Sequence, residues 1–185
     1  MDVEVIEEIQ DGNLFFRKIS LDDAEFFFES LNEKAMTKFL SLGPLVDIDH
    51  SKKIINNYLR YWDKYLQYNY IIETRGNNEI KKIGSTSLWN LSWLHKRAEI
   101  GIWINTKYWN LGIGKKALDL LKNIAFIHLK LHRLEAHIAV ENSRSIKLFK
   151  SSEFKEEGIL EEYLNFKGRF HNALVLACLN NNISI

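Results

Sequence analysis

Two glycines near the middle of the chain have the spacing of a phosphate-binding turn. Gly112 and Gly114 stand between an expected strand at residues 98–104 and an expected helix at residues 115–129. Glycines permit a tight turn, and the first turn of a helix leaves backbone N–H groups without partners inside the helix. These donors, with the positive end of the helix dipole, bind phosphate. The turn therefore predicts a ligand that carries a diphosphate, and a plain strand-to-helix turn is the alternative.

Glu99 is the candidate general base. It stands among apolar residues of the expected strand, where burial would raise the pKa of a carboxyl group toward the range that suits proton transfer. The alternative is a structural carboxylate paired with Arg97 or His95, or one that faces solvent. The histidines show no spacing typical of zinc proteases, so we expect no metal.

The elements that must position these residues alternate between strands and helices. Strands are expected at residues 14–19, 68–74, 79–89, 98–104, 133–140, 154–163 and 173–179, and helices at residues 20–31, 50–66, 112–129 and 142–150. Ser20 and Asp49 are the expected caps of the first two helices. This alternation predicts an α/β domain with a mixed sheet. We expect an N-terminal extension over residues 1–12, one domain over residues 13–180 and a frayed tail over residues 181–185.

The bulk composition excludes several classes of protein. The chain has 185 residues and a formal net charge of +1, which gives no support for a broad nucleic-acid or membrane surface. Its first residues are acidic, unlike a signal peptide, and no apolar run approaches the ~20 residues that span a bilayer. We therefore expect a cytoplasmic protein. The single cysteine, Cys178, is expected to be a small buried residue and not a nucleophile.

Three segments together resemble the GNAT superfamily of acetyl-coenzyme A-dependent N-acetyltransferases. They are residues 99–104 with the glycine turn, residues 131–142 with their terminal Glu-Asn, and residues 143–158. Residues 168–172 also resemble a loop of one branch, which contains the ribosomal-protein N-terminal acetyltransferases and their spermidine and amino-sugar relatives. The resemblance implies a GNAT-like, mixed and mostly antiparallel central sheet, splayed at its centre, with helices on both faces.

The resemblance also implies which residues bind acetyl-coenzyme A. Backbone groups of the strand would lie beside the pantetheine arm and the thioester, and amides of the turn would meet the pyrophosphate. The residues so implied are Ile102, Trp103, Ile104, Trp109, Asn110, Leu111, Gly112, Ile113, Gly114, Lys115, Asn142, Ser145 and Phe149. Asn142 is equally a helix N-cap, and a solvated helix face also explains Ser145.

Two residues depart from the family pattern. Trp109 stands where glutamine or arginine is usual, which leaves the phosphate to backbone amides. Phe149 stands where many members carry a tyrosine that protonates the departing thiolate. Because phenylalanine has no proton to give, another group or water must serve as the acid.

The function that we expect is acetyl transfer from acetyl-coenzyme A to a primary amine, with a protein N-terminus as the amine. A polyamine or amino sugar is the nearest alternative. Tyr163 and His95 are expected to line the amine site; a packed edge-strand tyrosine and a bystander histidine are the alternatives. A weak acetyl-coenzyme A sensor and an interaction module are the rivals from other classes. We expect no nucleic-acid or membrane partner, and the sequence leaves a homodimer open.

Overall fold

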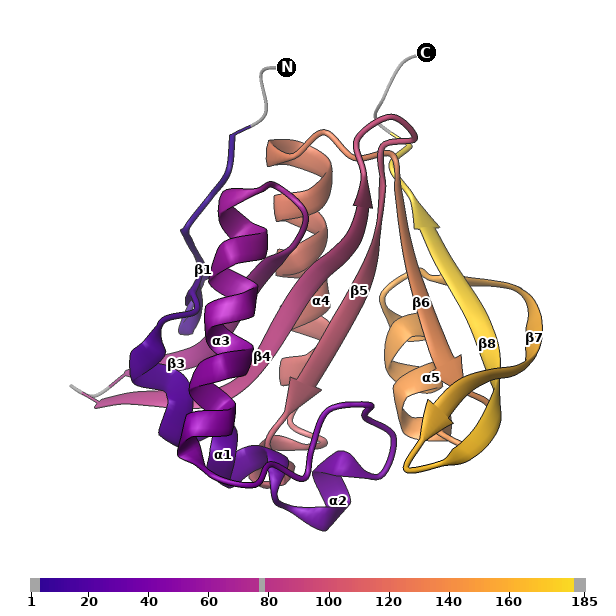
Figure 1. Cartoon of the computed structure of the whole chain (residues 1–185). Coiled ribbons are helices and arrows are strands. Elements are labelled where there is room, and N and C mark those ends of the chain that lie inside the picture. Colours follow the sequence, from indigo (N-terminus) through magenta and orange to yellow (C-terminus); the bar gives the residue numbers. More distant parts are fainter. Residues whose placement is uncertain (1–3, 77–78, 182–185) are drawn as a thin grey trace.

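The computed structural model describes residues 4–76 and 79–181, and it places all strands in one sheet with helices on both faces (Figure 1). Within the described residues, the sheet has eight strands in the order β1-β2-β3-β4-β5-β6-β8-β7. Among the described strands, only β5 and β6 pair in parallel, and every other neighbouring pair is antiparallel. The expected fold class, a mixed and mostly antiparallel sheet flanked by helices, is confirmed.

The strands and helices have the following bounds within the described residues. The strands are β1 (Glu8–Asp11), β2 (Leu14–Lys18), β3 (Tyr68–Gly76), β4 (Glu79–Ser92), β5 (Arg97–Ile104), β6 (Arg133–Ala139), β7 (Lys155–Phe166) and β8 (Arg169–Leu179). The helices are α1 (Ala24–Leu31), α2 (Lys34–Thr37), α3 (Ile48–Asp63), α4 (Ile113–Asn123) and α5 (Ser143–Ser151). Of the expected turn at residues 75–78, residues 77 and 78 lie outside the described residues.

The sheet separates two hydrophobic cores, because side chains alternate between the two faces of a strand. On β5, Ile100 and Ile104 belong to the larger core, which includes residues of α4. Trp103 points to the other face, where its ring lies 5.4 Å from that of Phe27 in α1. Helices α1 and α3 therefore cover one face of the central strands, and α4 covers the opposite face (Figure 1).

The ends of several elements differ from the prediction. Asp47, and not Asp49, caps α3, since its carboxylate accepts a hydrogen bond from the backbone N–H of His50. The expected helix at residues 112–129 ends its α-helical part at Asn123 and continues as a π-helical turn over Ile124–His128. Residues of the expected N-terminal extension pair as β1 along β2. Of the expected tail, residues 182–185 lie outside the described residues.

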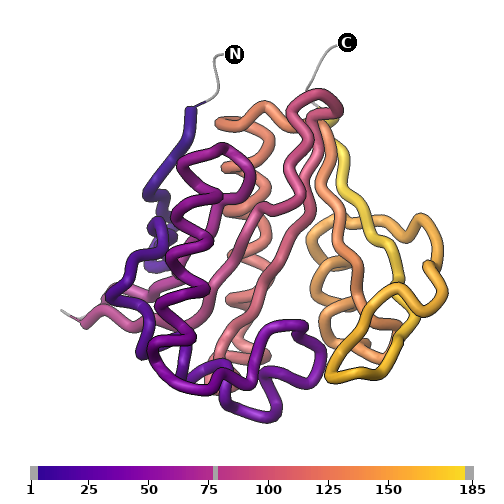
Figure 2. Tube along the Cα trace, viewed as in Figure 1, coloured from indigo at the N-terminus to yellow at the C-terminus, as the bar shows by residue number. Residues whose placement is uncertain are grey.

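The centre of the sheet opens between β5 and β6. Their parallel pairing consists of Arg97–Arg133, Ala98–Leu134 and Glu99–Glu135. Beyond these pairs the two strands diverge toward the lower end of the view, as the ribbon and the trace both show (Figures 1 and 2). The edge of β5 that faces β6 therefore has no strand partner past Glu99 within the described residues, so its backbone groups are free to bind a ligand. None of the described helices is long and apolar enough to cross a membrane.

Candidate functional site

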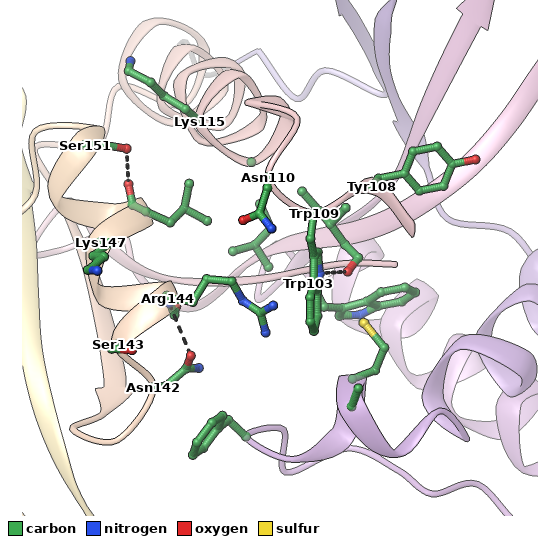
Figure 3. A pocket seen from close by; sticks show the side chains of 18 of the residues that line it. Trp103, Tyr108, Trp109, Asn110, Lys115, Asn142, Ser143, Arg144, Lys147 and Ser151 are labelled. Atoms are coloured by element: carbon green, nitrogen blue, oxygen red, sulfur yellow. Dashed lines mark hydrogen bonds between the residues drawn. The ribbon is translucent and has the colours of Figure 1, made fainter. Parts of the chain in front are cut away.

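A cavity of about 710 Å³ lies where β5 ends, between the turn before α4, the helix α5 and the connection from α1 to α3 (Figure 3). The wall combines aromatic, small and cationic side chains. Its lining residues are Ala35, Met36, Phe39, Leu40, Ile102, Trp103, Ile104, Tyr108, Trp109, Asn110, Gly112, Gly114, Lys115, Asn142, Ser143, Arg144, Ser145, Lys147, Leu148 and Ser151. A pocket of this size and composition suits a cofactor-sized ligand.

The turn before α4 has the backbone geometry that its glycines predicted. Gly112 adopts a φ of 74° and Asn110 a φ of 62°, both in the left-handed region that glycine and asparagine tolerate best. The indole N–H of Trp109 donates a hydrogen bond of 2.7 Å to the backbone oxygen of Ile104. This hydrogen bond fastens the turn to the end of β5. Trp109 therefore has a structural role that does not require a contact with phosphate.

Gly114 has a second role, in the packing of α4 against α5. A Cβ atom at this position would lie 3.0 Å from Cδ1 of Leu148 and 3.1 Å from Cδ2 of the same residue. A side chain here would push α5 away or enter the cavity. Glycine therefore keeps both the helix contact and the open approach to the first turn of α4.

Arg144 is a cation of the cavity that the sequence analysis did not single out. Its guanidinium carbon lies 3.1 Å from the centroid of the Trp109 ring, and the side chain points across the cavity (Figure 3). Partial burial lowers the pKa of Arg144 below its ordinary value. Lys115 at the same wall is already paired with Asp119 at 2.7 Å, whereas no described carboxylate pairs with Arg144. Arg144 is therefore a cation that an anionic ligand can bind.

Most residues expected to bind the cofactor line this cavity, and three do not. Leu111 is 65% exposed on the outer side of the turn, and Ile113 packs against the larger core. Phe149 is 2% exposed and packs against Phe154 at a ring separation of 5.0 Å. The side chain of Phe149 therefore belongs to the core, and its place beside the cofactor stays a prediction. Asn142 caps α5, since its Oδ1 accepts a hydrogen bond from the backbone N–H of Ser145, and it also lines the cavity; its contact with the cofactor stays a prediction.

Glu99 is buried at the point where β5 and β6 begin to diverge. Asn90 Nδ2 donates to Glu99 Oε1 at 2.6 Å, and His137 Nδ1 of β6 lies 3.2 Å from Glu99 Oε2. Burial acts to raise the pKa of Glu99, but His137 and Asn90 outweigh it, so the pKa lies below its ordinary value. The expectation of a raised pKa was wrong, because the sequence did not show which polar groups would meet the carboxylate. The partner is His137, not Arg97 or His95.

The two residues expected at the amine site lie apart from each other. Tyr163 of β7 is half exposed, and its ring lies 5.0 Å from that of His137. His95 is exposed in the turn between β4 and β5, at the end of β5 opposite to the cavity. Neither lines the cavity, and their contacts with an amine stay predictions. Residues 4–76 and 79–181 contain no cluster of three potential metal ligands.

A glycine turn at a helix N-terminus, a cavity beside splayed strands and a buried carboxylate–imidazole pair suit an enzyme that binds an anionic cosubstrate. The chain belongs to the acetyltransferase (GNAT) domain family, whose model matches residues 13–155. The protein is therefore an N-acetyltransferase with acetyl-coenzyme A as its cosubstrate.

Individual relatives agree with this family. The uncharacterized N-acetyltransferase p20 of Bacillus licheniformis is 28% identical over 94% of this chain and 97% of its own length. The crystal structure of a spermidine N-acetyltransferase from Vibrio cholerae, with coenzyme A and spermine, has a TM-score of 0.80 at 22% identity and covers 90% of this chain and 95% of its own. A ribosomal-protein-S5-alanine acetyltransferase from Vibrio fischeri has a TM-score of 0.83 at 18% identity, with coverages of 95% and 97%. At these identities the two solved structures show a shared fold.

Proposed function

We propose that acetyl-coenzyme A lies with its diphosphate on the turn at residues 110–115 and its pantetheine arm along the free edge of β5. The observation that carries this placement is the end of β5–β6 pairing at Glu99. Past this point the backbone of β5 offers free N–H and C=O groups to the amides of the arm. The same strand leads through Ile102 and Ile104 to the cavity and its turn.

The cation of Arg144 supports the same placement. A guanidinium without a carboxylate partner in the described chain stands opposite the N-terminus of α4 across the cavity (Figure 3). Both features attract the phosphate groups of the cosubstrate. The bound thioester supplies the acetyl group, and the protein positions it for attack by an amine.

We propose a protein N-terminus as the amine substrate. The carboxylates beside the divergence of β5 and β6 are already compensated: Glu99 by His137 and Asn90, and Glu135 by Arg133 at 2.5 Å. A polycation would need uncompensated carboxylates, whereas a single α-amine does not. An α-amine also has a pKa of about 7.7–8.0, so little free energy is required to deprotonate it near neutral pH.

A polyamine is the second candidate, and one observation favours it. Glu161 and Glu162 lie exposed on β7 next to Tyr163, and neither forms an ion pair with any described residue. These two carboxylates could bind the distal ammonium of a polyamine. The cytoplasmic location expected from the sequence stays a prediction.

A panel of amines tests the proposal. Acetyl-coenzyme A would be incubated with the protein and with peptides that carry a free N-terminus, the same peptides with a blocked N-terminus and an internal lysine, spermidine, and glucosamine. We expect mass spectrometry to find acetylation of the free α-amine only. Acetylation of spermidine alone, lost in the double variant Glu161→Gln and Glu162→Gln, would establish the polyamine instead. Binding of acetyl-coenzyme A without any acetylated amine would support the sensor.

A further inference from the structure

A histidine that the expected chemistry did not use lies beside the candidate base. His137 is on β6, two residues beyond Glu135, the last residue of β6 that pairs with β5. Since alternate residues of a strand share a face, His137 and Glu135 point to the same side of the sheet. Glu99 points to that side as well, because Trp103, four residues further along β5, packs there against α1. His137 and Glu99 therefore flank the point where the strands separate.

The contacts of Glu99 leave it little freedom to take a proton. Asn90 Nδ2 occupies one carboxylate oxygen at 2.6 Å, and the second oxygen lies 3.2 Å from His137 Nδ1. Asn90 has a φ of 48°, at an irregularity of β4 between Trp89 and Ser92. This left-handed conformation is one that asparagine tolerates, and it directs the amide to the carboxylate. Glu99 is held in place from two sides.

His137 has the environment of a proton acceptor. Its Nδ1 is buried and has no hydrogen-bond partner of good geometry among the described residues, but the Glu99 carboxylate lies within ion-pair distance, with Oε2 at 3.2 Å. A proton on Nδ1 leaves the lone pair on Nε2. Nε2 lies 4.0 Å from Glu135, a carboxylate that already binds Arg133.

We propose that His137, oriented by Glu99, is the catalytic base that takes the proton from the amine substrate; this inference rests on the proposed function. The Nε2 lone pair accepts one proton from the ammonium, and the electron pair left on nitrogen forms the new bond to the acetyl carbon. The carbon–sulfur bond breaks, and the departing thiolate takes the second proton lost by nitrogen. The imidazolium then returns its proton to water, so that protons and charge balance.

The charges that face the imidazole suit this role. The contact with Glu99 raises the pKa of His137 above its ordinary value, and the charge of Glu135 raises this pKa further. Burial and the charge of Arg97 lower it, but they do not outweigh the two carboxylates. Tyr163 of β7 faces the ring edge at 5.0 Å, and β8 contributes the apolar Val175 as the paired residue. A histidine of raised pKa matches an α-amine closely. Transfer to Glu99, whose pKa is lowered, would be less favourable than transfer to His137, whose pKa is raised.

The test compares single and double variants over a range of pH. His137→Asn keeps a donor toward Glu99 but removes the accepting nitrogen, and we expect kcat/KM for the amine to fall about 10²–10⁴-fold with unchanged acetyl-coenzyme A binding. We expect the wild-type kcat, measured at saturating amine, to rise with pH through an inflection that belongs to His137. That inflection should move to lower pH in Glu99→Gln and vanish in His137→Asn. The double variant should lose no more than His137→Asn, since the two residues act as a unit.

A matched control and a second variant complete the test. His132→Asn changes an exposed histidine of the same segment, just before β6, and should leave the profile unchanged. If His137→Asn fails to bind acetyl-coenzyme A, His137→Gln with and without added imidazole gives the same comparison, and rescue by imidazole supports the role. If the wild type is active and His137→Asn is equally active, or if only Glu99→Gln loses activity, the role of His137 is overturned while the proposed function stands. A wild type that acetylates no amine overturns the proposed function itself.

Discussion

Replacement of Arg144 by alanine should weaken the binding of acetyl-coenzyme A and leave the fold intact. The guanidinium lies over the Trp109 ring at 3.1 Å, on an exposed helix position, and no described carboxylate competes for it. A hydrogen bond to a charged group contributes about 1.5–3 kcal/mol. Because Arg144 is exposed and therefore screened by solvent, we take the lower end, about 1.5–2 kcal/mol, which corresponds to a 10–30-fold increase in Kd.

Isothermal titration calorimetry at low and high salt measures this effect. The loss should shrink at high salt, since ions screen an exposed cation. Lys150→Ala is the matched control, because Lys150 lies on the same helix but pairs with Glu156. Titration with 3′-dephospho-coenzyme A identifies the phosphate: an equal loss assigns Arg144 to the diphosphate, and no loss assigns it to the 3′-phosphate. If Arg144→Ala bound acetyl-coenzyme A at low salt with the Kd of the wild type, Arg144 would not bind the phosphates.

Three further substitutions test other parts of the structure. Gly114→Glu should abolish acetyl-coenzyme A binding in calorimetry, because the new side chain meets Leu148 at 3.0 Å and brings a negative charge; wild-type binding by the folded variant would place the phosphate elsewhere. Phe149→Tyr should destabilise the protein by about 1–3 kcal/mol in thermal unfolding, since the hydroxyl enters the core, and faster turnover would instead show that the position reaches the thiolate. Asp23→Asn should cost about 3 kcal/mol in urea unfolding, because it leaves the buried end of Arg17 with one carboxylate fewer. Burial acts to raise the pKa of Asp23, but Arg17 and other donors lower it overall, so its stabilisation is full above pH ~4 and is lost as the pH falls through the folded pKa. Asp23→Asn should reduce this acid sensitivity, and an unchanged pH dependence would contradict the assignment.

Local patterns predicted most of the elements, because those patterns act over a few residues. The apolar residues of β5 and the glycines at positions 112 and 114 were sufficient to predict a strand, a turn and a helix. The predicted ends of the elements were less accurate. Asp47 rather than Asp49 caps α3, because two acids close together in the chain offer the same capping signal. The pairing of β1 with β2 also escaped the prediction, because a short polar strand has no distinctive pattern.

The sequence by itself determined the family and the glycine turn that joins β5 to α4. These properties depend on residues close together in the chain. The tertiary structure decided what those residues meet. It joined Glu99 to His137 and Asn90, which lowers the pKa that burial alone would raise. It also turned Arg144 into the cavity and Phe149 into the core. Electrostatic and packing energies depend on distances across the sheet, and only the folded chain sets those distances.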